Sequence, residues 1–172
     1  GLAKRLGRFP LALELAGAYV AETKVGPEDF EAALAGRVPE TDASGLRFEV
    51  SGAVTGLMGI ILERIAAENP TVLDLLALCA FLAPGEVPCA LLRDGSAHLL
   101  PRLSKTVGQE ELFEKTVATL VRYGLAQRNV DGFCVHPLIQ WVTRRALNEE
   151  QRKAWAESAL RVVAAAFPVE SH

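Results

Sequence analysis

The sequence has few cysteines, a single methionine, few aromatic residues and no long hydrophobic run. Its three cysteines, Cys79, Cys89 and Cys134, are odd in number and do not make the disulfide framework of a small secreted domain. The longest apolar stretch without a charge, residues 50–62, is too short for a membrane span, which needs about 20 apolar residues. The N-terminus also lacks the apolar core and cleavage site of a signal peptide. We therefore expect a cytoplasmic protein with reduced thiols.

Motifs for nucleotide hydrolysis and for metal binding are absent too. No G-x-x-x-x-G-K-[ST] phosphate loop occurs, because the glycines at 52, 56 and 59 lack the lysine that the motif needs. Cys134 and His136 would share one face of a strand, but zinc needs about four ligands and a Cys–His nucleophile needs a third, orienting residue. Within these residues the sequence predicts neither an enzyme nor a metal site.

What is present is an apolar chain of nearly balanced charge. Half of its 172 residues are hydrophobic, which is enough for one domain with an appendage and a buried core. The formal net charge of −3 excludes a disordered polyelectrolyte and disfavours a broad nucleic-acid-binding surface. The chain begins at Gly1, within an amphipathic segment, and we expect it to be a piece of a longer polypeptide.

The first part of the chain is predicted to be helical. Apolar residues at helical spacing predict helices over 10–22 and 27–36, each begun by a proline, with Gly36 as a left-handed stop. Residues 1–36 are then a helical segment, and the polar residues 37–51 are a linker.

Residues 52–147 have the order of elements that is typical of a winged-helix domain. Asp131-Gly132, between two short apolar runs, predicts a two-stranded hairpin whose turn is Asn129 to Gly132. The helices predicted before the hairpin lie around 58–65, 72–82, 88–93 and 110–123. For residues 94–108 the sequence is consistent with either a helical turn or a loop. The expected fold is mostly α: a helical segment, a winged-helix domain with a three-helix core and a β-hairpin wing, and trailing helices, the last over 148–172.

Winged-helix domains often bind DNA, so the helix over 110–123 is the first place to look for phosphate contacts. It carries Glu110, Glu111 and Glu114 against only two cations, and the wing tip adds Asp131. Phosphate contacts need clustered Lys and Arg, so the charge disfavours DNA binding here.

His136-Pro137 places an imidazole where a strand meets a helix N-terminus. Free N–H groups and the helix dipole favour an anion at such a place, which makes a phosphate site one interpretation. The other is that His136 simply caps the helix or bonds a carbonyl, and the local residues favour this second interpretation.

Two groups of segments carry a resemblance to a known family. Residues 2–20, with Phe9-Pro10-Leu-Ala-Leu, resemble the Gly-x-Pro-Leu-Ala-Leu segment of signal-transduction ATPases (STAND proteins) of NB-ARC type. Residues 78–84, 120–128 and 135–140 resemble, in order, the winged-helix part of that family. The bacterial branch with tetratricopeptide repeats after the ATPase is the closest likeness.

The resemblance implies two nucleotide contacts. By matching position Pro10 would pack against a bound adenine nucleotide, and His136 would contact the ADP phosphate, as the histidine of the Met-His-Asp motif does. This chain departs from the pattern, since Arg8 replaces a glycine and Val135 and Pro137 stand where Met and Asp would be. Pro137 has no carboxylate, so a conformational latch that depends on the Asp of the motif is not expected in this chain. The expected contact of His136 with the phosphate is unaffected by this difference.

The implied role is that of a nucleotide-state reader in a larger ATPase. The P-loop core would precede Gly1 and helical repeats would follow His172, with self-assembly on activation. ADP would hold the winged helix in an inactive position, and exchange for ATP would release it. The isolated chain is expected to bind ADP or ATP weakly or not at all. A DNA-binding regulator and a protein-interaction module that ignores nucleotide are the alternatives.

Overall fold

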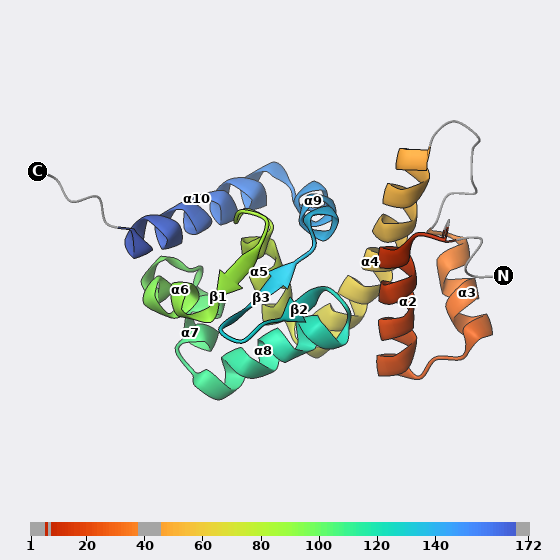
Figure 1. Cartoon of the computed structure of the whole chain (residues 1–172), viewed down its shortest axis with the longest axis horizontal. Coiled ribbons are helices and arrows are strands. Elements are labelled where there is room, and N and C mark those ends of the chain that lie inside the picture. The colour runs from red at the N-terminus through yellow and green to blue at the C-terminus, as the bar shows by residue number, and fades with distance from the viewer. Residues whose placement is uncertain (1–5, 7, 38–45, 168–172) are drawn as a thin grey trace, which may run out of the picture.

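Helices make up most of the chain, and a small three-stranded antiparallel sheet lies among them (Figure 1). The computed structural model describes residue 6 and residues 8–37 and 46–167. The expectation of a mostly α fold is thus confirmed. None of the helices in these ranges is long and apolar enough to cross a membrane.

The N-terminal helices follow the sequence closely. α2 (Pro10–Thr23) and α3 (Pro27–Ala35) each begin with proline at the first turn, where its missing N–H had no partner to lose. The expected left-handed stop at Gly36 is wrong, because Gly36 has φ −93° and its N–H closes a right-handed turn on Leu34. The left-handed residue is instead Lys24, at the end of α2, with φ 55°.

α4 (Leu46–Glu68) is one long helix that begins inside the segment expected to be a linker. Residues 46–51 are therefore helical, while 38–45 lie outside the described residues. Its three glycines do not end it, because both flanks are packed: α2 and α3 contact it on one side, α5 and α9 on another. In Figure 1, α4 runs from α2 and α3 to the rest of the molecule.

α5 (Pro70–Cys79) is the central helix, as its all-round apolar sequence predicts. It contacts α4, α7, α8, α9 and α10, and its residues 75–79 are all buried. Residues 94–108, which the sequence left open, form a 3₁₀ turn (Ser96–His98) and α7 (Pro101–Val107). The remaining helices before the hairpin are α6 (Cys89–Asp94) and α8 (Glu110–Arg122), which confirm the sequence expectation.

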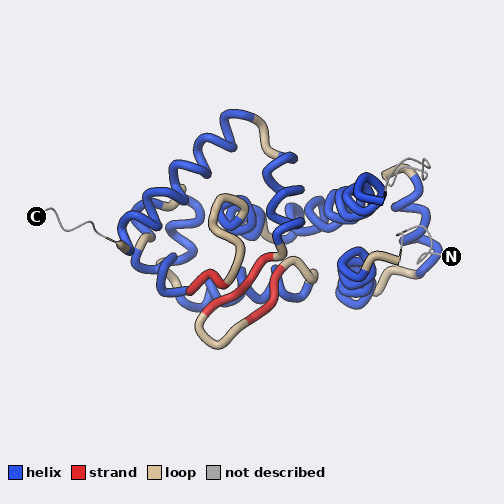
Figure 2. The backbone as a smooth tube through the Cα atoms, turned by 45° about the horizontal axis from the view of Figure 1, so that its top comes forward, coloured by secondary structure: helices blue, strands red, loops and turns tan. Residues whose placement is uncertain are grey.

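The sheet has one more strand than expected. The predicted hairpin is present as β2 (Ala126–Arg128) and β3 (Gly132–Val135), but β1 (Glu86–Pro88) pairs with the other edge of β3, in the order β1-β3-β2 (Figure 2). A strand of three residues ending in proline carries no alternation that sequence could reveal. Gly132 permits the pairing, since a Cβ there would lie 2.2 Å from the Val87 carbonyl oxygen.

The C-terminal helices are α9 (Pro137–Ala146) and α10 (Glu149–Ala166). Asn148 and Gln151 form a capping box at the start of α10, with both reciprocal hydrogen bonds. One cluster of buried apolar side chains runs from Leu6 to Val162 through all these helices. The helical segment before residue 36 is therefore packed on the rest of the chain, and the division at 36, 51 and 147 stays a prediction.

Candidate functional site

His136 is the N-cap of α9, directly after the last strand. Its Nδ1 accepts a hydrogen bond from the backbone N–H of Leu138 at 3.1 Å, and its ring is exposed. The capping interpretation of His136 is thus confirmed. Because Nδ1 accepts, the neutral imidazole carries its proton on Nε2, which leaves one N–H donor that this cap does not use.

The ring of His136 borders a pocket of about 130 Å³ between α2 and the sheet. Leu11 and Glu14 line it from α2, Pro137 from the start of α9, and Cys134 from β3. The remaining lining residues are Gly124, Leu125, Ala126 and Gln127, the turn and strand that follow α8.

The two residues expected to contact nucleotide belong to elements that meet at this pocket. Pro10 is the first residue of α2, exposed, and immediately precedes Leu11 in the pocket wall. Pro10 itself does not line the pocket, whereas His136 does. The roles of Pro10 and His136 as nucleotide contacts stay predictions.

Sequence reasoning missed Glu14. It lies four residues after Pro10 and so on the same face of α2, a spacing that could have identified it. Glu14 lines the pocket, and among the described residues His136 is the one lining residue that can carry a positive charge. A phosphate entering the pocket would gain one N–H donor and meet a carboxylate, so these residues supply a single phosphate contact and no charge neutralisation.

The turn after α8 fixes α2 against the pocket. Gly124 has φ 74°, and a Cβ on it would lie 3.2 Å from the Ala18 Cβ, so α2 approaches the backbone of this turn closely. Next to it the Tyr123 ring lies 6.5 Å from that of Tyr19, centroid to centroid, and the latter stacks on Phe30 at 5.5 Å.

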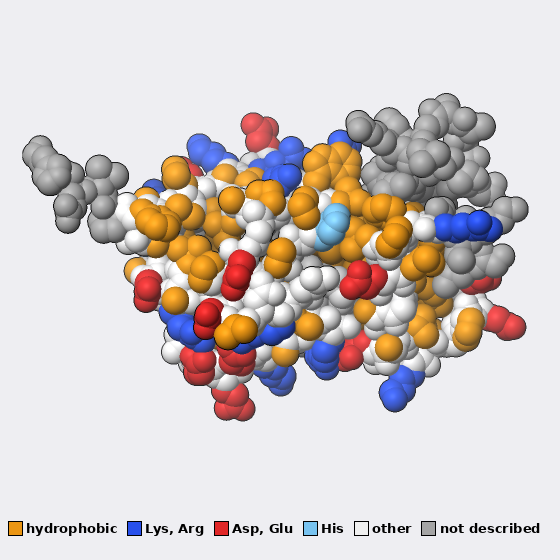
Figure 3. Space-filling model, viewed as in Figure 1, with side chains coloured by type: hydrophobic (Ala, Val, Ile, Leu, Met, Phe, Trp, Pro, Cys, Tyr) orange, Lys and Arg blue, Asp and Glu red, His pale blue; other side chains and the backbone are white. Residues whose placement is uncertain are grey.

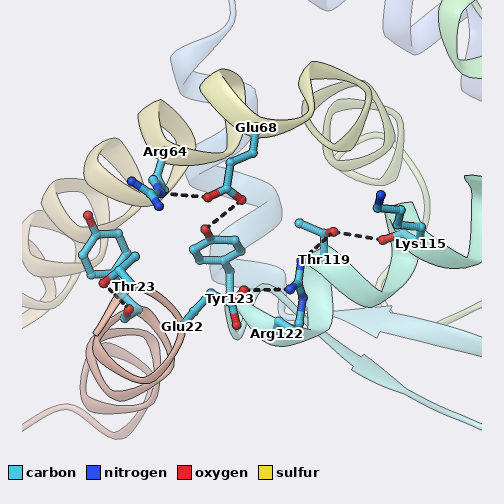
Figure 4. Close-up of polar contacts among 9 residues, drawn as sticks. Glu22, Thr23, Arg64, Glu68, Lys115, Thr119, Arg122 and Tyr123 are labelled. Carbon is cyan, nitrogen blue, oxygen red and sulfur yellow. Dashed lines mark hydrogen bonds and ion pairs between the residues drawn. The ribbon is translucent and has the colours of Figure 1, made fainter. Parts of the chain in front are cut away.

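Polar contacts hold the same junction, as Figure 4 shows. Arg122 lies 2.7 Å from a Glu22 oxygen, and the Tyr123 hydroxyl donates to Glu68 at 3.1 Å. Arg64 donates to the other Glu68 oxygen at 2.8 Å. Burial is the main cause that raises the pKa of Tyr123, which keeps this phenol a donor.

The face with which a winged helix would read DNA, where the sequence disfavours DNA binding, carries arginine–glutamate pairs. Arg128, on the strand before the wing, donates to Glu114 at 2.9 Å, and Arg93 lies 2.5 Å from Glu110. Figure 3 shows acidic side chains gathered over the end of α8 nearest α7, with basic ones among them. The two arginines beside α8, Arg93 and Arg128, are thus already engaged by carboxylates.

The cysteines are poor candidates for chemistry. Burial raises the pKa of Cys79 to about 12, and burial raises that of Cys89 as well, so both stay protonated thiols. Cys134 and His136 do border the same pocket. Among the described residues no group of three or more His, Cys, Asp and Glu could hold a metal ion.

A family described as a domain of unknown function (DUF7779) matches residues 64–152, just over half of the chain. The match begins in the last turns of α4 and ends in the first turn of α10, so it includes His136 and leaves out Pro10. No curated protein and no solved structure matches the chain significantly.

Proposed function

The chain belongs to the DUF7779 family, and from its own residues we propose that it is the regulatory, nucleotide-state-sensing part of a STAND ATPase of NB-ARC type. In this proposal a P-loop core lies before Gly1 and helical repeats follow His172. The protein works in the cytosol, and the parent, not these residues, hydrolyses ATP.

The observation that carries the proposal is that His136, whose Nδ1 accepts the α9 cap bond, lines a pocket shared with α2. One ring nitrogen is committed to the helix cap, which fixes the imidazole plane, and the other is left as a donor at the pocket edge. A donor fixed in this way suits a phosphate oxygen. Pro10, one residue from the pocket wall, would pack against the base of the same nucleotide.

The charge around the pocket explains why the nucleotide must be shared with another part of the parent. Glu14 lines the pocket and, among the residues that the structure describes, no Lys or Arg does, so these residues could not neutralise two or three phosphates there. A P-loop supplies that neutralisation through its backbone N–H groups and lysine. These residues would therefore read the nucleotide, and the upstream core would hold it.

The arrangement of elements supports a winged-helix assignment for this region. α8 ends in the left-handed Gly124 and leads into the β2–β3 hairpin, and β1 completes a three-stranded sheet beside it. In the proposed mechanism, ADP bridges the upstream core and His136 and holds this unit in the inactive position. A phosphate contact made in only one of two arrangements is what allows a nucleotide to shift them.

A protein-interaction module that ignores nucleotide is the second candidate. Large apolar side chains are exposed at the end of α10, where Leu160 is 70% and Phe167 is 73% exposed, and this favours a macromolecular contact there. DNA binding is disfavoured, because Arg93 and Arg128 are paired with glutamates beside α8.

The test is the rate of ADP release from the parent protein with His136→Ala and His136→Asn. Asparagine keeps an oxygen that caps α9 but cannot reproduce the Nε2–H donor. Faster release in both variants supports phosphate sensing. Faster release in the alanine variant alone would assign His136 to the cap, and unchanged release in both would favour the interaction module. The absence of a P-loop in the coding sequence before Gly1 would also contradict the proposal.

A further inference from the structure

α10 carries a second apolar face besides the one that packs on the core. It contacts α5, α6 and the 3₁₀ turn, and the side chains that it buries on that side are Trp155, Ser158, Ala159 and Val162. Leu160, Val163 and Phe167 lie outside this set and are 70%, 37% and 73% exposed. Figure 3 shows hydrophobic side chains gathered over the end of α10. An apolar surface of this kind on a folded chain indicates an interaction site.

The exposed apolar residues form one stripe along the helix. The stripe has the spacing i, i+4, i+7 and i+11 and consists of Ala156, Leu160, Val163 and Phe167, all exposed. At about 100° per residue these four lie within about 60° of one another, and the stripe is about 17 Å long. The charged residues between its ends lie outside this arc. Phe167 continues the last turn of α10, since its N–H donates to the Val163 carbonyl at 3.2 Å.

The stripe differs from the other exposed apolar residues that the structure describes. The remaining large apolar side chains that are exposed lie singly on α2, α8, the hairpin turn and α9, and they are Leu13, Leu112, Val130 and Trp141. Single exposed apolar residues are normal on a protein surface and indicate nothing by themselves. A contiguous stripe at helical spacing instead has the pattern by which one helix packs on another.

The stripe is complementary to itself. Two antiparallel copies of a helix, related by a twofold axis through the middle of the stripe, place its first residue opposite its last. Ala156 of one copy then faces Phe167 of the other, and Leu160 faces Val163. The smallest side chain thus meets the largest at each end, and two aliphatic side chains meet near the axis, as interdigitating helices require. Such a contact uses the same surface on both copies, which is the symmetry of most homodimers.

Charge and size are compatible with a weak pair of copies. The formal net charge is −3 for 172 residues, so long-range repulsion between two copies is small. The charged residues beside the stripe, Glu157 and Arg161, are of opposite sign and add no net charge to it. A single helix stripe of this length falls short of the about 800 Å² per partner of a standard interface, so the pairing depends on concentration in the micromolar range.

We propose that this chain pairs with a second copy of itself through α10, in an antiparallel contact along Ala156, Leu160, Val163 and Phe167. The contact removes from water the apolar side chains that the rest of the chain leaves exposed, which is its driving force. It uses no residue of the His136 pocket and requires no nucleotide. The pairing therefore stands independently of the proposed function, and it differs from an assembly triggered by exchange of ADP for ATP.

Analytical ultracentrifugation of the 172-residue chain, without nucleotide, measures the pairing. Between about 5 µM and about 500 µM we expect the mass to rise from 18.5 kDa towards twice that value. Leu160→Glu should weaken the dimer at least about tenfold, because two carboxylates would lie close together near the axis. Leu13→Glu is the matched control, because Leu13 is exposed on α2 and receives the same change of charge. A mass that stays at 18.5 kDa over this range, or equal weakening by both substitutions, would overturn the pairing.

Disulfide cross-linking tests the antiparallel register. In a Cys134→Ser background, a mixture of Leu160→Cys and Val163→Cys chains should be linked under mild oxidation faster than either chain is linked to itself. The reason is that the two positions face each other across the antiparallel pair, within the short span that a disulfide bridges. Faster linking of either chain to itself would overturn this register. Far-UV circular dichroism reports whether each variant is folded, and the α10 variants should be, because the substituted side chains are exposed.

Discussion

The guanidinium of Arg122 lies 2.7 Å from the carboxylate of Glu22 and joins the end of α8 to the last turn of α2, 100 residues earlier. The pair is partly exposed, and Arg122 also donates to the Thr119 hydroxyl at 3.2 Å. It lies beside Tyr123 and Gly124, which form the apolar part of the same junction. These contacts position the first turns of α2, and therefore Glu14 and Pro10, relative to His136.

A double-mutant cycle with Glu22→Ala and Arg122→Ala should give a small coupling free energy. Both side chains reach solvent, so we expect about 0.2–1 kcal/mol from urea unfolding, and less at high salt. Arg64→Ala in place of Arg122→Ala is the control, because Arg64 pairs with Glu68 and not with Glu22. A coupling as large for the control would contradict a direct Glu22–Arg122 interaction.

Gly124→Ala should destabilise the α2 junction more than the loss of that ion pair. Alanine is strained at φ 74°, and its Cβ would lie 3.2 Å from that of Ala18, so a loss of about 1–3 kcal/mol is expected. Hydrogen exchange should show faster opening of α2 than of α5. Gly17→Ala, in α2 with open space around it, is expected to be neutral or stabilising.

Gln140→Leu should cost stability although the side chain stays buried and similar in size. The Gln140 amide donates to the carbonyls of Cys79 at 2.7 Å and Leu82 at 3.2 Å, and thereby satisfies the end of α5. The Cys79 carbonyl also accepts from the Leu82 N–H at 3.2 Å, so the substitution removes one of its two donors and the amide donor of Leu82. The loss of both hydrogen bonds should lower the free energy of unfolding by about 1–3 kcal/mol in urea denaturation. The exposed Gln127→Leu serves as the control, and an equal effect there would refute the capping role.

His136→Ala should lower thermal stability through loss of the α9 cap, by about 0.5–2 kcal/mol. His136→Asn should recover most of it, since its side-chain oxygen can accept from the Leu138 N–H. Calorimetry of the 172-residue chain measures both. If the two variants melt at the same reduced temperature, the cap is not what His136 contributes to folding.

Stability should fall as pH rises above about 9. Burial raises the pKa of Cys79 from 9.0 to about 12, so the unfolded chain loses this proton first. The contribution of Cys79 is complete below pH 9 and is lost as pH approaches 12, at up to about 1.4 kcal/mol per pH unit. Urea unfolding at about pH 8 and about pH 10 measures the loss. Cys79→Ala should reduce the pH dependence.

Local sequence determined most of the helices and the hairpin. The signals that identify these elements each lie within a few residues, so sequence spacing is sufficient to find them. They are the proline at a first helical turn, the capping box at Asn148 and the turn at Asp131-Gly132. The capping interpretation of His136 is of the same kind, because its hydrogen bond reaches only to Leu138. The nucleotide contacts came from a resemblance and stay predictions.

Tertiary packing decided the rest. The short strand β1 exists because Gly132 lets the Val87 backbone approach, and α4 continues through its glycines because neighbouring helices cover it. Glu14 and His136 meet in one pocket only because Gly124 admits α2 against the turn after α8. Val87 and Gly132 are well apart in the sequence, and Glu14 and His136 are more than 100 positions apart, so no periodicity or motif in a single sequence reports these approaches.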